Sequence, residues 1–161
     1  MSAAAFIAVD WGTTNRRAYR VEDGAAVETI RDDRGVVAMT RSAFPAEVAE
    51  LRARLGDLPV LFAGMAGSTR GWVDVPYLPC PAGLAELAAG AIWAEPGRTV
   101  LLPGLSFTDA ACADVCVAKR CSCWARSTQG SRRGTRCSAS LVPIANGREW
   151  RASALRNFAR R

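Results

Sequence analysis

The first residues able to do chemistry stand in the string "FIAVDWGTTNRRAYR", where an acid is followed by a glycine and two hydroxyls. Residues 6–9 form an apolar run that predicts a buried strand, which is expected to end at Asp10. Gly12 lets backbone N–H groups approach an anion closely, Thr13 and Thr14 add donors, and the acid suits Mg²⁺ or its water. The pattern predicts a phosphate-binding turn, with an ordinary β-hairpin as the alternative.

Two more glycine-containing turns follow buried strands further along the chain. The apolar run 59–63 opens into "GMAGSTRGW", residues 64–72, and the run 99–102 opens into "PGLSFTD". Three strands that end in such turns are expected to bring them to one ligand. This convergence favours a ligand site over an isolated hairpin.

The elements that must position these turns are a mixture of strands and helices. Residues 26–31 predict a further strand, and a short helix is expected at 84–91. A longer helix is predicted to begin at the N-cap Ser42 and to end at Gly56. Its apolar positions follow helical spacing: Phe44, Val48, Leu51 and Leu55. The first 115 residues therefore predict an α/β fold.

Three stretches of the chain resemble the 2-dehydro-3-deoxygalactonokinase family in order and spacing: "VDWGTTNRRAYR", "LFAGMAGSTRGWVDVPYLPCPAGL" and "LLPGLSF". The resemblance covers about residues 5–115. It implies an incomplete N-terminal lobe of the actin-like ATPase fold, which is ribonuclease H-like. It also implies ATP-dependent phosphorylation of 2-dehydro-3-deoxy-D-galactonate at the 6-hydroxyl, a step of galactonate catabolism.

The same resemblance implies a nucleotide site at the first turn. Asp10 would lie beside Mg²⁺ and the transferred phosphate. The phosphates of ATP would be cradled by Gly12, Thr13, Thr14 and Asn15. Of Arg16 and Arg17, strand alternation lets one face the site, and the sequence favours neither.

A sugar-acid site is implied at the second turn. Its expected residues are Gly64, Gly67, Ser68, Arg70 and Trp72. Arg70 is the candidate for binding the substrate carboxylate, because a guanidinium suits two-pronged carboxylate contacts. A solvated loop arginine is the alternative. Trp72 and Tyr77 either wall this pocket or belong to the core.

Kinases of this superfamily use an aspartate to accept the proton of the sugar hydroxyl. Asp114 lies at a family motif and is the candidate base, with Asp109 as the alternative. Cys80 and Cys112 are expected to fill small apolar spaces, since the chain has no histidine to activate a thiolate.

The amino-acid composition limits the classes of protein to which this chain can belong. Half of the 161 residues are hydrophobic, and the mean hydropathy is near zero, as is typical of a soluble domain. No apolar stretch is long enough to span a membrane, and the first residues lack the basic region of a signal peptide. We expect a cytoplasmic protein whose partners are ATP and a sugar acid, without a membrane contact. The sequence leaves the oligomeric state open.

The last part of the chain differs sharply from the rest. Residues 1–115 carry 14 acidic and 10 basic side chains, a net charge of −4, whereas residues 116–161 carry 11 basic side chains and 1 acid, a net charge of +10. Four of the six cysteines also lie in this tail. We therefore expect two regions, a kinase lobe over 1–115 and a disordered basic tail over 116–161.

The tail begins where the family resemblance stops. Related chains continue with "DVMRGEE" and later "PGTHSKW". Reading the codons for residues 116–125 one base earlier, with degenerate codons chosen freely, restores "MRGEE", and the same shift of residues 140–147 permits "PGTHSKW". We interpret the tail as a frameshift in a kinase gene, and we expect the truncated lobe to be inactive.

Two other interpretations of the tail remain. The first is a zinc site made by Cys112, Cys116, Cys121, Cys123 and Cys137. Their spacing lacks the paired Cys-x-x-Cys of common zinc modules. The second is a basic nucleic-acid-binding arm, for which nonspecific attraction to phosphates is expected but no specific recognition.

Overall fold

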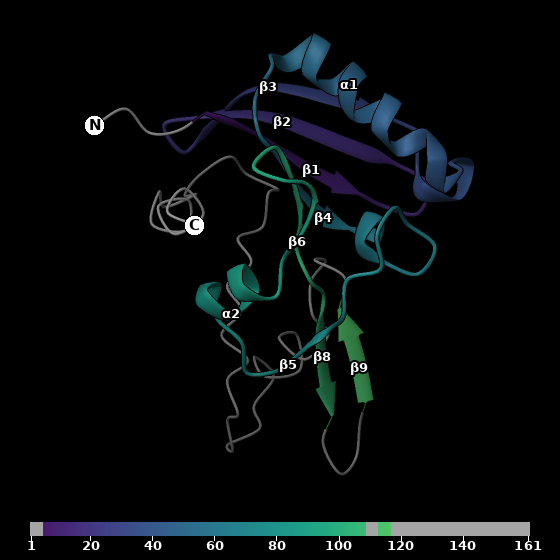
Figure 1. Ribbon diagram of the computed structural model, residues 1–161, viewed down its shortest axis with the longest axis vertical. Helices are drawn as coiled ribbons and strands as arrows, with labels where there is room; N and C mark the ends of the chain where they lie inside the picture. Colours follow the sequence, from purple (N-terminus) through teal and green to yellow (C-terminus); the bar gives the residue numbers. More distant parts are fainter. Residues whose placement is uncertain (1–4, 109–112, 117–161) are drawn as a thin grey trace, which may run out of the picture.

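A six-stranded sheet forms the centre of the molecule. The structure, a computed structural model, describes residues 5–108 and 113–116 (Figure 1). The strand order is β3-β2-β1-β4-β7-β6. The strands are β1 (Phe6–Trp11), β2 (Arg16–Glu22), β3 (Ala25–Asp32), β4 (Val60–Gly64), β6 (Ile92–Glu95) and β7 (Thr99–Leu101).

The strand directions divide this sheet into two halves. β1, β2 and β3 form an antiparallel meander. β1, β4 and β7 run parallel to one another, and β6 returns antiparallel to β7. A meander continued by parallel strands is the ribonuclease H-like arrangement, so the predicted α/β fold class is confirmed.

One helix covers one face of the sheet. Figure 1 shows α1 (Phe44–Leu55) lying across the strands. Alternate residues of β1 face it and are fully buried, namely Ile7, Val9 and Trp11. The four predicted apolar residues of α1 are buried in the same cluster. The opposite face of β1 and β2 carries a second, smaller cluster of buried side chains: Phe6, Ala8, Tyr19 and Val21.

The predicted N-cap of this helix is wrong by one residue. α1 begins after Ala43, which makes no side-chain cap. Ser42 lies in a preceding 3₁₀ turn, η2 (Arg41–Ala43), and its hydroxyl is 3.2 Å from the Thr40 hydroxyl. A proline within the first turn of α1 supplies a preset helical φ instead of a cap. The predicted end is confirmed, because the Gly56 N–H donates to the Arg52 carbonyl.

The other predicted elements begin and end within two residues of the observed ones, but β8 (Leu105–Thr108) lies in the stretch "PGLSFTD", which the sequence predicted as a turn. The second predicted helix, α2 (Leu84–Ala89), stops two residues early. β6 then begins, and the sequence did not predict it. Its four residues, "IWAE", are too short and too mixed for a periodicity to show.

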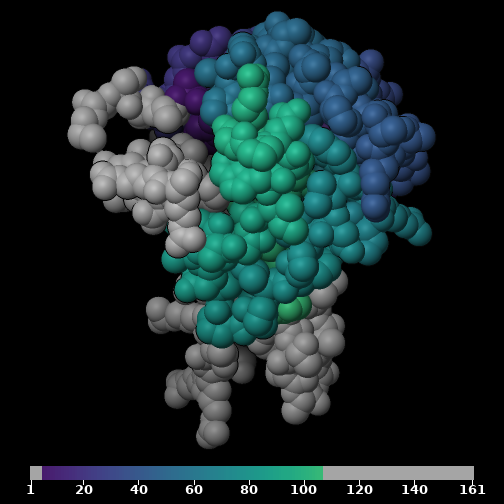
Figure 2. Space-filling view, viewed as in Figure 1, coloured from purple at the N-terminus to yellow at the C-terminus, as the bar shows by residue number. Residues whose placement is uncertain are grey.

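A separate three-stranded sheet completes the described part of the chain. Its order is β5-β8-β9, with β5 (Leu78–Pro79), β8 (Leu105–Thr108) and β9 (Ala113–Cys116). In the space-filling view the green β6–β7 region lies against the blue residues of α1 (Figure 2). Among the described residues, no helix has the length and apolarity needed to cross a membrane.

The predicted tail is almost entirely outside the described residues. β9 includes Cys116, and residues 117–161 follow it without a described structure. The zinc and nucleic-acid interpretations of the tail therefore stay predictions. So does the interpretation of the tail as a frameshift.

Candidate active site

The three predicted turns emerge at the same edge of the sheet. β1, β4 and β7 are parallel neighbours, with Asp10 opposite Ala63 and Phe62 opposite Leu101. Their carboxyl ends therefore point the same way, and open α/β sheets bind ligands at that edge. The adjacency of the three strands, which sequence alone did not establish, supports a common site.

Asp10 lies inside β1, one residue before its end, and carries an unsatisfied oxygen. Its Oδ1 atom is buried and has no hydrogen-bond partner among the described residues. A Cβ on Gly64, at φ +98°, would lie 3.3 Å from this oxygen and 2.7 Å from the Trp11 carbonyl oxygen. A buried carboxylate oxygen without a donor is costly unless a ligand completes it. The donor type fits Mg²⁺ or a water bound to it.

The turn after β1 presents its polar side chains to solvent. The Gly12 N–H donates to the Asn15 carbonyl at 2.8 Å and closes the turn. Thr13, Thr14 and Asn15 are exposed. The Asn15 side-chain amide donates to the Thr14 hydroxyl at 3.0 Å. Donors that face solvent from a closed turn are suited to an anion such as phosphate.

The back of this turn is held by a segment that the sequence analysis did not single out. The N–H groups of Val36 and Val37 donate to the Gly12 and Thr13 carbonyls at 3.0 and 3.1 Å. These valines begin the 3₁₀ turn η1 (Val36–Ala38). A Cβ on Gly35 would lie 2.2 Å from the Thr13 carbonyl oxygen. Gly35 is therefore required for the close contact between this segment and the turn.

The structure separates the two arginines that follow the turn. The Arg16 side chain is fully buried on the α1 face, 2.6 Å from both Asp32 Oδ2 and Glu47 Oε2. Its guanidinium carbon also lies 5.0 Å from the centre of the Trp11 ring. Arg17 points to the other face, where its Nη1 is 3.5 Å from Asp10 Oδ2. Arg17 is thus the arginine beside the candidate phosphate site.

Two acidic residues of α1 connect the buried Arg16 to the more exposed Arg34: Glu47 contacts both arginines, and Glu50 contacts Arg34. The Arg34 Nη1 atom is 3.0 Å from Glu47 Oε2 and 2.5 Å from Glu50 Oε2. A hydrogen bond with Glu50 and the charge of Glu47 raise the pKa of Arg34. The Trp11 indole N–H donates to the Arg34 carbonyl at 2.7 Å. Ion pairs and a backbone contact therefore join β1, β3 and α1 behind the turn.

The second turn folds tightly on itself. The Ser68 hydroxyl donates to the Met65 carbonyl at 2.7 Å, and the Trp72 N–H donates to the Ala66 carbonyl at 2.8 Å. A Cβ on Gly71 would lie 2.2 Å from the Ala66 carbonyl oxygen. This requirement for glycine at position 71 was not predicted from the sequence. The predicted residue Gly67 accepts a hydrogen bond from the Val75 N–H through its carbonyl, at 2.9 Å.

Arg70 stands at the exposed tip of this loop. Within the described residues it makes no hydrogen bond or ion pair, so its charge is available to a ligand. The carbonyls on either side of it are held by Arg41 of η2. The Arg41 Nε donates to the Gly71 oxygen at 3.2 Å, and Nη2 donates to the Thr69 oxygen at 2.9 Å.

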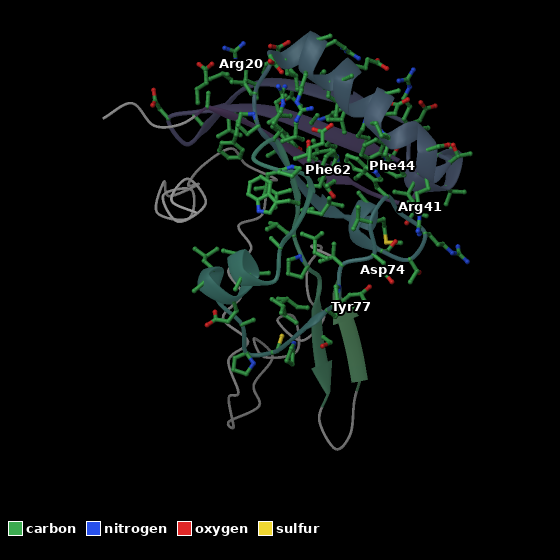
Figure 3. The ribbon with its side chains drawn as sticks, in the orientation of Figure 1. Arg20, Arg41, Phe44, Phe62, Asp74 and Tyr77 are labelled. Carbon is green, nitrogen blue, oxygen red and sulfur yellow. The ribbon has the colours of Figure 1, made fainter. Side chains whose placement is uncertain are left out.

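The two candidate aromatic residues lie in different surroundings. Trp72 stacks on Phe44 with ring centres 5.9 Å apart and meets Phe62 edge-on at 6.1 Å. Tyr77 is 40% exposed, and Figure 3 shows it near the exposed Asp74 on the segment after the loop. Asp74 is an exposed carboxylate just after the loop 64–72, and it was not among the residues predicted from the sequence. The sequence feature that could have identified Asp74 is its place as an acid within the string "GWVDVP".

The remaining candidates are only partly described. Asp114 lies in β9, opposite Phe107, and the position of its side chain is not described. Asp109 and Cys112 lie outside the described residues. Cys80 is partly buried and packs against a small apolar cluster with Leu87 and Leu105. Within the part of the chain that the structure describes, no group of acidic or cysteine side chains has the geometry of a metal centre.

Comparison with known proteins identifies the family of the chain. Residues 10–117 match the family model of the 2-keto-3-deoxy-galactonokinases. A protein of Rhizobium meliloti (strain 1021) named "Probable 2-dehydro-3-deoxygalactonokinase DgoK1" is 35% identical over 121 residues, which are 71% of this chain and 39% of the relative. The 2-dehydro-3-deoxygalactonokinase of Escherichia coli (strain K12) is 34% identical over 105 residues, 60% of this chain and 36% of the relative.

A solved structure shares the fold. A crystal structure assigned to a 2-dehydro-3-deoxygalactonokinase from Sinorhizobium meliloti has a TM-score of 0.59 and 31% sequence identity, covering 68% of this chain and 38% of that one. The chain thus spans less than two fifths of each of these relatives.

Proposed function

Because this chain belongs to the 2-keto-3-deoxy-galactonokinase family, we propose that it carries the phosphate-binding lobe of a cytoplasmic sugar-acid kinase. The reaction is transfer of the γ-phosphoryl group of ATP to the 6-hydroxyl of 2-dehydro-3-deoxy-D-galactonate. The observation that carries the proposal is the unsatisfied Oδ1 of Asp10 beside a closed glycine-hydroxyl turn. No contact among the described residues accounts for that oxygen.

In this proposal the first turn binds the phosphates. Phosphoryl transfer requires mainly positioning and neutralisation of charge. Backbone N–H groups and hydroxyls of Thr13 and Thr14 contact phosphate oxygens, and Asn15 adds its amide. Asp10 holds Mg²⁺ directly or through water, and Mg²⁺ supplies neutralisation of phosphate charge. Arg17, beside Asp10, balances the carboxylate and meets the same anion.

The loop 64–72 binds the sugar acid in this proposal. A Cβ on Gly64 would lie 3.3 Å from Asp10 Oδ1, so glycine at this position keeps a side chain away from that oxygen. Arg70 pairs with the substrate carboxylate, with Gly67, Ser68 and Trp72 shaping the loop around it. For the base that accepts the hydroxyl proton, Asp114 and Asp109 stay candidates, and the exposed Asp74 joins them.

The chain as given is proposed to be inactive by itself. It spans 39% and 36% of the two named relatives, and a kinase of this superfamily binds ATP between two lobes. The alternative is an inert fragment whose tail is translated out of frame. A nucleic-acid-binding role would rest on the charge of residues 116–161 alone.

The carrying observation is tested by comparing Asp10→Asn with Asp23→Asn. Asp23 is an exposed acid in the β2–β3 turn, so its substitution makes the same charge change away from the site. We expect Mg²⁺-ATP to raise the melting temperature of the unsubstituted chain and of Asp23→Asn, but not of Asp10→Asn. A stabilisation that survives in Asp10→Asn would contradict the proposed phosphate site.

Inactivity and the frameshift have separate tests. The purified chain, incubated with ATP, Mg²⁺ and the sugar acid, is expected to form no phosphorylated product, and clear turnover would contradict this. Resequencing the gene across the codons for Asp114 to Ala118 decides the origin of the tail. An extra base that restores "DVMRGEE" would mean that the gene encodes a longer kinase, whereas an unchanged sequence would confirm the tail.

A further inference from the structure

The exposed side chain of Arg41 forms hydrogen bonds with the backbone on both sides of Arg70. Arg41 precedes α1, about 30 residues before the loop that it contacts. Its guanidinium donates to the carbonyl of Thr69 and to that of Gly71, the two residues that flank Arg70. Figure 3 shows Arg41 at the side of this loop, while Phe44 of the same segment points into the core.

The described hydrogen bonds within the loop do not use the Thr69 and Gly71 carbonyls, which accept from Arg41 instead. The Gly71 N–H donates to the Ser68 carbonyl at 2.7 Å, and the Trp72 N–H donates to the Ala66 carbonyl. Both bonds use donors that follow Arg70. The described contacts of the Thr69 carbonyl and the Gly71 carbonyl come from Arg41. Arg41 therefore supplies the remaining restraint on the direction of the Arg70 side chain.

Arg70 itself has no described partner, although it carries a positive charge and is exposed in the loop 64–72. We propose that Arg41 is a positioning residue, which fixes the backbone around Arg70 so that Arg70 presents its guanidinium to the carboxylate of the substrate. This inference rests on the proposed function of the loop 64–72. It adds a residue outside that loop to the recognition of the acid group.

The geometry also says why arginine is needed at position 41. A planar guanidinium donates in two fixed directions, so it bridges carbonyls two residues apart. A lysine ammonium keeps the charge but is a point donor on a flexible stem. Arg41→Lys therefore removes the bridge without removing the charge. Arg54→Lys is the matched control. Arg54 is half-exposed, and its long 3.7 Å ion pair with Glu50 lies entirely within α1.

The first measurement is amide hydrogen exchange of the full chain over residues 66–75. We expect exchange of the Gly71 and Trp72 amides to be about tenfold faster in Arg41→Lys than in the unsubstituted chain, and unchanged in Arg54→Lys. Equal exchange in Arg41→Lys and the unsubstituted chain would overturn the proposal, because the loop would then hold its shape without Arg41.

The second measurement is titration of 2-dehydro-3-deoxy-D-galactonate, followed by NMR shifts of the arginine Nε–H signals. We expect Arg41→Lys to weaken binding about tenfold, because a displaced guanidinium loses a charge-assisted hydrogen bond. In an Arg70→Gln background the same substitution should have no further effect. A purely structural role of Arg41 would weaken binding equally in both backgrounds, and that result would overturn the proposal.

The two measurements distinguish a failure of the proposed function from a failure of the role proposed for Arg41. If the unsubstituted chain shows no shift with the sugar acid, the role of the loop in the proposed function fails, and the ligand part of this inference fails with it. Amide exchange would still report whether Arg41 orders the backbone at Arg70. Normal binding by Arg41→Lys, together with faster exchange, would retain the loop as a binding site and reject Arg41 as its positioning residue.

Discussion

The first two of the loops at the carboxyl edge of the sheet are held in different ways. The turn 12–15 makes one internal backbone bond, from the Gly12 N–H to Asn15, and is otherwise supported by residues 35–37 and by the buried Arg16 behind it. The loop 64–72 is held mainly by its own hydrogen bonds, with one exposed arginine added from outside. The shape of the turn therefore depends mainly on distant residues, whereas the loop combines its own hydrogen bonds with the two that Arg41 donates.

This difference matters for the chemistry expected of each loop. A phosphate cradle must keep several donors fixed at once, since the electrostatic gain depends on preorganisation. Support from a buried ion pair and a packed backbone segment provides that rigidity. A loop that recognises a sugar acid needs fewer fixed groups, and its outermost side chain, Arg70, is restrained from the surface. The comparison can be tested by disturbing each support separately.

The largest effect is expected from a methyl group at the two tightly packed glycines. Gly35→Ala and Gly71→Ala each place a Cβ 2.2 Å from a backbone oxygen, so the backbone must move. We expect each to lower the free energy of unfolding by about 3 kcal/mol, as overpacking does. Urea denaturation measures this. Gly97→Ala is the control, since its Cβ would meet nothing within 4 Å and its φ of +69° costs about 1 kcal/mol.

These glycine variants also separate the two loops. Gly35→Ala should abolish stabilisation by Mg²⁺-ATP even at temperatures where the protein remains folded. Gly71→Ala should leave that stabilisation in place, because it disturbs the other loop. Equal loss of nucleotide response in both variants would mean that the loops are not supported independently.

A smaller effect is expected from the two adjacent arginines of β2. Arg16→Met leaves Asp32 and Glu47 without their buried partner, and we expect a loss of about 2 kcal/mol in the free energy of unfolding. Arg17→Met removes a half-exposed pair at 3.5 Å and should cost less than about 1 kcal/mol. Urea midpoints of the two variants give the comparison. Equal midpoints would show that the buried network does not support the turn.

The smallest effect is expected at the far end of the parallel strands, where a pH-dependent contact lies away from both loops. The Thr99 hydroxyl and Arg52 lower the pKa of Glu95 from its ordinary value of 4.5. Since the folded pKa is below the unfolded one, this stabilisation is present above pH 4.5 and is lost as pH falls through the folded pKa. The partly exposed Glu95 keeps it below about 1 kcal/mol.

Glu95→Gln tests this contact by urea denaturation across the acidic range. The variant should be less stable than the unsubstituted chain at pH 7, and the difference should shrink as the pH falls through the folded pKa of Glu95. Glu86, whose pKa is lowered by the backbone N–H groups of Glu86 and Gly83, is present in both proteins and cancels. A difference that does not change with pH would show that Glu95 acts through packing and not through its charge.

Much of the fold was predictable because the sequence patterns that predict its strands and helices are local. Apolar runs predicted the strands β1, β4 and β7, and helical spacing predicted the buried face of α1. The start of α1 was predicted wrongly, because Ser42 resembles an N-cap while a proline one turn later decides where the helix begins. β6 was missed because its pairing with β7, not its own composition, makes it a strand.

The candidate site was predictable only in part. Asp10, the turn after it and Arg70 were identified from residue types and order. Gly35, Gly71 and Arg41 were not, because their importance lies in contacts with residues distant along the chain or with a fold of the loop that sequence does not show. Such contacts leave no pattern in a single sequence.

The sequence by itself determined the family, the α/β fold class, the parallel strands β1, β4 and β7 with the helix α1, and the acid that precedes the turn 12–15. Those properties depend on local order and on residue type. The tertiary structure alone decided that Arg17 faces Asp10 while Arg16 is buried, that three turns share one edge, and that Arg41 brackets Arg70. The physical reason is that strand alternation offers two faces equally, and only the packing of α1 on one of them distinguishes core from site.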